Sequence, residues 1–322
     1  MLSLKTVARR FAFGLLALPV LLNAPVLRAE DSPKMAFVTN NASEFWKIAA
    51  AGVHAYEKET GVKIDIYMPT NGKVEEQNQI LENLTSQGYK AIAVSAIAPK
   101  DQTNAINRAA KKAALICFDS DAPKSNRLCY IGTDNFQAGQ TLGKEIVKLL
   151  PNGGEMAVFV GTFSADNAAQ RLAGIEDAIK GKNITIVAKK EDETDRNKAR
   201  TNVENAINAF GNVKLLCGLW SYNGPGIAKA IKASGKKGQI IGAVFDEEDD
   251  TLAAIAGGII TCTVVQKPYE FGYRSSKMMH ELLTKGNAVI PENKNIDTGV
   301  KVINAENVAE FKTELAKLKG GK

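Results

Sequence analysis

The chain has 322 residues, of which 45% are hydrophobic and 24% are charged, as is typical of a globular protein of one or two domains with a sizeable core. The formal net charge is +6, but residues 1–29 hold four basic and no acidic side chains, which leaves 37 basic and 35 acidic residues in the rest. Such a balance excludes the strongly basic surface typical of nucleic-acid-binding proteins, so we expect no nucleic-acid partner.

Residues 1–29 have the pattern of a secretory signal peptide. Lys5, Arg9 and Arg10 precede an apolar stretch, residues 11–22, that is short for a membrane span, and Ala29 offers a cleavage point. A retained membrane anchor is the alternative. We expect a protein exported to the periplasm, with the signal peptide cleaved near Ala29.

The first half of the remaining chain alternates apolar runs with segments of helical periodicity. We expect strands at 34–39, 62–68, 91–95, 115–118 and 128–131, and helices at 44–60, 74–87 and 102–112. Repeated units of this length predict parallel strands with right-handed crossovers.

The same pattern starts again near residue 136. We expect helices at 136–150, 168–180, 198–210, 227–233, 248–256, 269–285 and 308–317, and strands at 155–160, 185–190, 213–219, 240–245, 259–265 and 300–304. The prediction is an α/β fold of two similar Rossmann-like lobes, whose parallel sheets are joined by a multi-strand hinge. After the signal peptide at 1–29, we assign residues 30–134 plus 267–296 to an N-terminal lobe and residues 135–266 plus 297–322 to a C-terminal lobe.

Four cysteines lie in apolar, strand-like runs. They are Cys117, Cys129, Cys217 and Cys262, and their spacing matches no metal motif. Export would permit disulfides, which leaves Cys117–Cys129 and Cys217–Cys262 open as pairs. We favour buried free thiols that pack as small hydrophobic side chains.

Polar and aromatic side chains follow the predicted strands, at the edge where ligands bind in open parallel sheets. Carboxylates, amides and arginine exchange hydrogen bonds with vicinal hydroxyls, and an aromatic face covers the C–H face of a ring. The set therefore predicts a neutral, polyhydroxylated ligand. The predicted ligand-binding residues are Ser43, Phe45, Trp46, Ser95, Asp119, Asp121, Asn167, Arg171, Thr194, Tyr222, Asn223, Asp246 and Gln266.

Several of these residues have a purely structural alternative. Adjacent residues at a helix start cannot both point the same way, so of Phe45 and Trp46 we expect one in the core and one in the cleft. Asp246 could cap the following helix, and the acidic run 247–250 could hold a cation, although a solvated helix N-terminus is the interpretation we favour. Arg171 could lie on the surface of its helix.

At these positions the chain resembles the ribose-type periplasmic sugar-binding proteins, the type I solute-binding proteins of ABC importers, over residues 34–302. The matching motifs, in chain order, are the aromatic pair Phe45-Trp46, the central Asp119, Arg171 and Gly174 of an R-x-x-G motif, Asn223, Phe245-Asp246 and Gln266. The resemblance implies a monomeric protein of two lobes that closes on a monosaccharide and delivers it to a membrane permease.

The chain also departs from the ribose-binding pattern. Ser120 stands where ribose binders have Arg, Ser43 where they have Asn, and Thr194 where they have a ring-covering Phe, a role that Trp220 or Tyr222 could take over. The Asp-Ser-Asp sequence at 119–121 is also similar to that of binders of rhamnose or of the furanosyl signal autoinducer-2. The resemblance therefore implies a small sugar or polyol and leaves its identity open.

The sequence is compatible with three functions. The first is the binding protein of an ABC importer. The second is an exported carbohydrate-active enzyme, for which Asp119 and Asp121 would have to act as acid and base, because the chain has no G-x-S-x-G, H-E-x-x-H or P-loop motif. The third is a ligand-sensing subunit for a chemoreceptor or kinase. We favour the binding protein, with no enzymatic activity, no cofactor and no metal.

Overall fold

The computed structural model describes residues 33–70 and 72–319, so the predicted signal peptide lies outside the described residues. The first series of elements comprises β1 (Met35–Val38), α1 (Glu44–Thr60), β2 (Ile64–Tyr67), α2 (Val74–Ser86), β3 (Ala91–Val94), α3 (Thr103–Ala110), β4 (Ala114–Phe118) and β5 (Tyr130–Gly132).

The second series comprises α4 (Asn135–Leu149), β6 (Gly154–Val160), α5 (Asp166–Ile179), β7 (Ile184–Glu191), α6 (Arg196–Ala209), β8 (Val213–Gly218), α7 (Asn223–Ala233), β9 (Ile241–Phe245), α8 (Asp249–Ala256) and β10 (Cys262–Val265). The remainder comprises α9 (Pro268–Lys285), the 3₁₀ helix η2 (Gly286–Val289), β11 (Asn295–Asp297), β12 (Lys301–Asn304) and α10 (Val308–Leu318). No helix of the described residues combines the length and the apolar character needed to cross a membrane.

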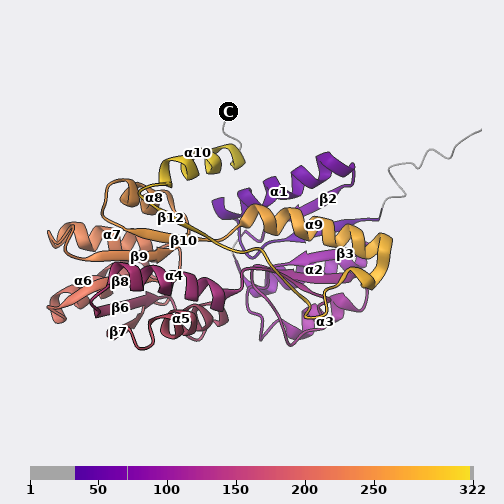
Figure 1. Ribbon diagram of the computed structural model, residues 1–322. Helices are drawn as coiled ribbons and strands as arrows, with labels where there is room; N and C mark the ends of the chain where they lie inside the picture. Colours follow the sequence, from indigo (N-terminus) through magenta and orange to yellow (C-terminus); the bar gives the residue numbers. More distant parts are fainter. Residues whose placement is uncertain (1–32, 71, 320–322) are drawn as a thin grey trace, which may run out of the picture. The chain divides into compact units, whose positions relative to one another are not determined.

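The named strands form two six-stranded sheets (Figure 1). The first sheet has the order β11-β5-β4-β3-β1-β2, and the second has the order β12-β10-β9-β8-β6-β7. Every pair of these strands is parallel except β10 with β12. The predicted α/β fold with two similar, mainly parallel sheets is confirmed.

Helices cover both faces of each sheet. In the first sheet, α1 and α9 pack on one face, and α2 and α3 pack on the other. In the second sheet, α4 and α5 cover one face, and α6, α7, α8 and α10 cover the other. The inner strands β1, β3 and β4 are therefore apolar throughout, as expected for parallel sheets that are buried on both sides, whereas the edge strands β7 and β11 carry exposed polar residues.

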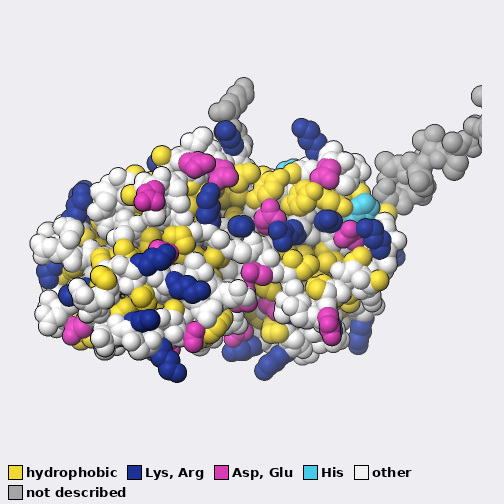
Figure 2. All heavy atoms as spheres, in the orientation of Figure 1, with side chains coloured by type: hydrophobic (Ala, Val, Ile, Leu, Met, Phe, Trp, Pro, Cys, Tyr) yellow, Lys and Arg dark blue, Asp and Glu magenta, His cyan; other side chains and the backbone are white. Residues whose placement is uncertain are grey.

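The chain passes from one sheet to the other three times: between β5 and β6, between β10 and β11, and between β11 and β12. These passages form the multi-strand connection that the sequence predicted. On the face shown in Figure 2, basic and acidic side chains are interspersed on both halves of the fold.

Many element ends differ from the expected ones by one or two residues, and strand β10 begins at Cys262 and not at residue 259. Helix α7 begins at Asn223 and not at residue 227, because Pro225 lies in the first turn, where a missing N–H breaks no helical hydrogen bond. Strand β5 is displaced toward the C-terminus, to Tyr130–Gly132. Strand β11, only three residues long and largely exposed, had no recognisable pattern.

All four cysteines are buried free thiols, which confirms the favoured interpretation and excludes both disulfide pairs in this structure. Burial raises the pKa of Cys129 to about 11, so its thiol stays protonated at neutral pH.

Candidate ligand-binding site

Two cavities lie beyond the carboxyl ends of the parallel strands, as expected for an open α/β sheet. We call them the first cavity, with a volume of about 830 Å³, and the second cavity, with a volume of about 810 Å³. They share Asn40, Asp119, Asn167 and Trp220 in their walls and therefore adjoin one another. Both are lined from elements of the first and the second sheet, so the cleft that they form lies between the two halves of the fold.

Most of the predicted ligand-binding residues line this cleft. The second cavity is lined by Ser43, Phe45, Trp46, Asp119, Asn167, Arg171, Tyr222, Asp246 and Gln266. Asp121 lines only the first cavity. Ser95 and Asn223 are buried behind the walls, and Thr194 is exposed in the turn before α6 and lines neither cavity.

Two aspartates occupy equivalent places in the two sheets. Asp119 follows β4 and Asp246 follows β9, each directly after a phenylalanine, and both have positive φ angles, 54° and 68°. Each backbone is held by the neighbouring strand: the two amide N–H groups donate to Ile131 O and Val264 O. Asp tolerates the left-handed region better than most residues, so this turn aims a carboxylate into the cleft from each sheet.

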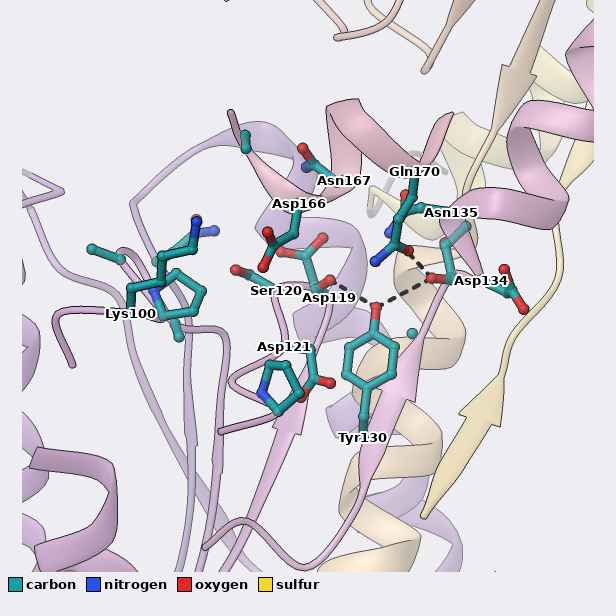
Figure 3. Close-up of a pocket in the computed structure, with 18 of the residues that line it drawn as sticks. Lys100, Asp119, Ser120, Asp121, Tyr130, Asp134, Asn135, Asp166, Asn167 and Gln170 are labelled. Carbon is teal, nitrogen blue, oxygen red and sulfur yellow. Dashed lines mark hydrogen bonds between the residues drawn. The ribbon is translucent and has the colours of Figure 1, made fainter. Parts of the chain in front are cut away.

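Hydroxyl groups from the same neighbouring strands, β5 and β10, bind these two backbones as well. Tyr130 Oη donates to the carbonyl of Asp119 over 2.8 Å, and Thr263 Oγ1 donates to the carbonyl of Asp246 over 2.7 Å. The first of these bonds is drawn in Figure 3. The two carboxylates are therefore positioned by the fold before any ligand arrives.

The Asp119 side chain is held by a short chain of polar groups. Ser95 Oγ donates to Asp119 Oδ2 over 2.8 Å, and Asn40 Nδ2 donates in turn to Ser95 Oγ over 3.2 Å. Burial raises the pKa of Asp119 to about 6, although the Ser95 bond and the nearby Arg171 oppose this rise and Asp246 adds to it. That the charges of Arg171 and Asp246 influence Asp119 indicates that the two sheets present these groups to one site.

Arg171 is the buried cation of the site and is only 2% exposed. Its Nε donates to Asn135 Oδ1 over 3.0 Å, its Nη1 donates to Leu219 O over 2.7 Å, and Nη1 lies 3.7 Å from Asp246 Oδ2. The guanidinium also stacks over the ring of Phe245, 4.3 Å from its centroid. The alternative of a surface arginine is thus wrong.

Gly174 explains how the R-x-x-G pattern places Arg171. Helices α4 and α5 pack so closely that a Cβ on Gly174 would lie 2.1 Å from Phe136 O, and a Cβ on Gly139 would lie 2.1 Å from Arg171 O. Only glycine permits this approach, which brings the α5 backbone at Arg171 against α4.

Asp246 takes part in a link that reaches the passages between the sheets. Gln266 Nε2 donates to Asp246 Oδ1 over 3.0 Å, and Thr133 Oγ1 donates to Gln266 Oε1 over 2.9 Å. Gln266 follows β10 and Thr133 follows β5, so both lie where the chain leaves one sheet for the other. Asp246 does not cap α8, because the N-cap residue of that helix is Glu248.

The two aromatic residues at the start of α1 both line the second cavity and differ in burial. Trp46 is 2% exposed, packs in the core and donates from Nε1 to Asn40 Oδ1 over 3.0 Å. Phe45 is half-buried and packs edge-on against Trp46, with ring centroids 4.9 Å apart. From the other half of the fold, half-buried Trp220 and Tyr222 add aromatic surface to the second cavity.

In the first cavity, Asp119, Ser120 and Asp121 extend from the end of β4, and Asp166, Asn167 and Gln170 extend from the start of α5 (Figure 3). Asp121 forms a two-point ion pair with Arg127, with contacts of 2.5 and 2.7 Å. This pairing neutralises Asp121 and leaves it poorly suited to act as a free acid or base beside Asp119.

We expected all of residues 247–250 to form a solvated helix end, and this expectation is wrong for Glu247. Glu247 is buried, lines the second cavity and has one carboxylate oxygen, Oε2, without a hydrogen-bond partner. Glu248, Asp249 and Asp250 each pair with a cation. Among the described residues, no group of three or more potential ligands is arranged to hold a metal ion.

Four residues that contribute to the site were missed from the sequence. Asn40 lines both cavities and lies two residues after the end of β1, so the strand-end rule could have found it. Asp192 is fully buried and accepts hydrogen bonds from Tyr222 Oη and Asn223 Nδ2, but it stands in a run of charges that suggested a surface loop. Asn135, which orients Arg171, gave no signal beyond its polarity, and Glu247 was considered only as part of the acidic run 247–250, for which we favoured a solvated helix end.

A model of the family described as a periplasmic binding protein domain matches residues 35–288. The chain belongs to the periplasmic binding proteins. It is 27% identical over 272 residues to the D-allose-binding periplasmic protein of Escherichia coli (strain K12), covering 80% of this chain and 88% of that one. It is also 27% identical to the ribose import binding protein RbsB of Haemophilus influenzae, over 76% of this chain and 82% of that one.

Solved structures of periplasmic binding proteins give the same result. A solute-binding protein of an ABC transporter from Burkholderia graminis, in complex with D-arabinose, superposes with a TM-score of 0.78 and 31% identity, covering 85% of this chain and 96% of that one. These relatives carry the names of binding proteins and not of enzymes.

Proposed function

We propose that this periplasmic binding protein captures a monosaccharide or related small polyol in the cleft and delivers it to an ABC permease. The observation that carries the proposal is the pair of Asp119 and Asp246, one from the end of a central strand in each sheet, in the wall of one cavity. The names of the allose- and ribose-binding relatives and the D-arabinose complex of the solute-binding protein support the class of ligand.

The two halves have separate tasks in this proposal. Residues 30–134 plus 267–296 form the N-terminal lobe and contribute Asp119, and residues 135–266 plus 297–322 form the C-terminal lobe and contribute Arg171 and Asp246. A ligand that bonds to both lobes favours the closed arrangement, since only that arrangement provides both sets of contacts. The closed form then presents a distinct surface to the permease.

The site is built for hydroxyl recognition. Carboxylate oxygens of Asp119 and Asp246 accept from hydroxyls, the Arg171 guanidinium and the Asn167 amide donate to ring and hydroxyl oxygens, and Phe45 or Trp220 covers an apolar face. We further propose that the protein acts as a monomer, without enzymatic activity, after export to the periplasm and cleavage near Ala29.

Isothermal titration of the purified protein with pentoses, hexoses, deoxysugars and polyols tests this function. We expect one ligand per chain with micromolar or tighter affinity and recovery of the ligand unchanged. Failure of every compound to bind would refute the proposal, and turnover of the bound sugar would replace it with the enzyme hypothesis.

A further inference from the structure

Acidic side chains outnumber basic ones in the walls of the second cavity. Six acidic and three basic side chains line it. Asp246 is paired with Arg171, at 3.7 Å, and Glu248 with Arg196, at 2.8 Å. These two pairs use two of the three cations.

Two more carboxylates of the second cavity pair with lysines: one with Lys319, the third basic residue of the wall, and one with Lys229, which lies outside the wall. Lys319 Nζ lies 3.6 Å from Asp249 Oδ1, and Lys229 Nζ lies 3.5 Å from Asp250 Oδ2. Asp119 and Glu247 are then left without a cation of their own, because none of the ion pairs among the described residues includes either of them.

The two residues without a cation, Asp119 and Glu247, line the second cavity from opposite halves of the fold. Asp119 has Ser95 as its hydrogen-bond donor, and Glu247, only 8% exposed, has an oxygen with no partner at all. An unsatisfied buried polar group is costly and is rare in a folded protein, so a ligand donor that reached Glu247 Oε2 would remove this cost. The adjoining first cavity, which shares Asp119, contains six aspartates and one lysine and does not compensate this charge.

We infer that the ligand is a polyhydroxylated compound that carries a basic nitrogen, an amino sugar or amino polyol, whose ammonium group is bound by Glu247 and Asp119. This inference rests on the proposed function and narrows its ligand class. An ammonium group supplies three donors and one positive charge, which is what these carboxylates lack. Charge-assisted hydrogen bonds of this kind are about twice as strong as neutral ones.

The groups around Glu247 fit this assignment. Burial raises the pKa of Glu247 to about 8, the neighbouring Asp246 adds to the rise, and Lys319 and, more weakly, Arg171 oppose it. Before a cation binds, the carboxyl group is therefore largely protonated near neutral pH. A bound ammonium group would stabilise the carboxylate form, so binding should release a proton.

The test compares matched ligands in the wild-type protein. The pairs are D-glucosamine and D-glucose, D-galactosamine and D-galactose, and 1-amino-1-deoxy-D-glucitol and D-glucitol, with the uncharged N-acetyl-D-glucosamine as a further control. We expect at least one amine to bind about tenfold or more tightly than its hydroxyl counterpart, a difference of about 1.4 kcal/mol. Calorimetry in buffers of different ionisation enthalpy should detect the released proton.

A single substitution tests whether Glu247 is responsible for the preference for the amine. Glu247→Gln keeps the size of the side chain and removes the charge, and it should abolish most of the preference for the amine. Glu176→Gln is the matched control, since Glu176 is half-exposed, pairs with Lys189 and lies outside both cavities. It should leave the preference unchanged.

The outcomes separate the inference from the function on which it rests. Neutral sugars that bind as tightly as their amines, or more tightly, would overturn the inference and leave the sugar-binding function intact. If neither neutral sugars nor their amines bind, the proposed function falls and the inference falls with it. The wild-type comparison decides even if Glu247→Gln does not fold.

Discussion

At the scale of single residues, the site depends on carboxyl groups that the fold holds away from water. Glu247 is buried, and its pKa is raised from its ordinary value of 4.5 to about 8 by burial and by Asp246. Between these two values the folded protein keeps a proton that the unfolded chain has lost. Stability therefore falls as the pH rises through this window.

Replacement of Glu247 by Gln should remove this dependence. The melting temperature of Glu247→Gln minus that of the wild type should increase by several degrees from pH 5 to pH 8, because each pKa unit is worth about 1.4 kcal/mol. Thermal unfolding at several pH values measures this difference in melting temperature. For the control variant Glu176→Gln, the difference from the wild type should not change with pH. If the difference between Glu247→Gln and the wild type is also independent of pH, the pKa of Glu247 is not raised in the folded protein.

Replacement of Arg171 should lower the free energy of unfolding. Arg171→Met retains an unbranched side chain but leaves Asp246 as a buried carboxylate without its cation and leaves Asn135 Oδ1 without its donor. We expect a loss of about 3–5 kcal/mol in the free energy of unfolding. Urea titration of Arg171→Met and of Arg171→Met/Asp246→Asn provides the check. The double variant should recover part of the loss, and a double variant as unstable as the single one would contradict this account.

At the scale of elements, glycines set the distance between paired helices. The contact between Gly174 in α5 and the Phe136 carbonyl in α4 has a counterpart in the other half of the fold, where a Cβ on Gly272 in α9 would lie 1.9 Å from Ala49 O in α1. Figure 1 shows both helix pairs side by side. The two halves thus share a packing device as well as a strand-end aspartate.

Gly174→Ala should therefore act on stability and on the site together. The added methyl group must push α5 away from α4 at the turn that holds Arg171, at an expected cost of about 1–3 kcal/mol. Gly211→Ala is the control, since nothing lies within 4 Å of the position that a Cβ would take there and its φ is not positive. Urea unfolding and calorimetry with the ligand measure the two effects. Equal stability of the two variants would show that the α4–α5 contact is not tight.

The elements also show which features a sequence can reveal. The apolar periodicity predicted α1 with both of its observed ends, because a polar turn precedes it and Gly61 stops it. The strand-end rule led to Asp119 and Asp246, since parallel strands must bring their carboxyl ends together.

Features that depend on packing could not be predicted. Asp192 and Glu247 stand in charged runs that look solvated, and only the tertiary structure buries them. Ser95 and Asn223 follow strands as ligand residues would, yet they lie behind the cavity walls and orient Asp119 and the Trp220 backbone. Thr194 follows a strand too, but it is exposed and lines neither cavity.

At the scale of the whole molecule, the link from Thr133 through Gln266 to Asp246 connects the passages between the sheets with the ligand site. A ligand bound at Asp246 should therefore favour the closed arrangement of the two halves. Because the closed arrangement is more compact, the radius of gyration measured by small-angle X-ray scattering should fall when the ligand binds. Asp119→Asn, which preserves the backbone preference for positive φ but weakens the contact from one half, should reduce this change at a fixed ligand concentration. An unchanged scattering curve at saturation would argue against a hinge motion.

The central claim is that Asp119 and Asp246 hold one small polyhydroxylated ligand between them. Native mass spectrometry of the protein purified without refolding tests it most directly, with Asp119→Asn and Asp246→Asn prepared in parallel and shown to fold by thermal unfolding. We predict that the wild type retains, or takes up from a mixture of sugars and amino sugars, one molecule of monosaccharide size with its mass unaltered, and that each variant loses it. Retention of the same molecule by both folded variants would contradict the claim.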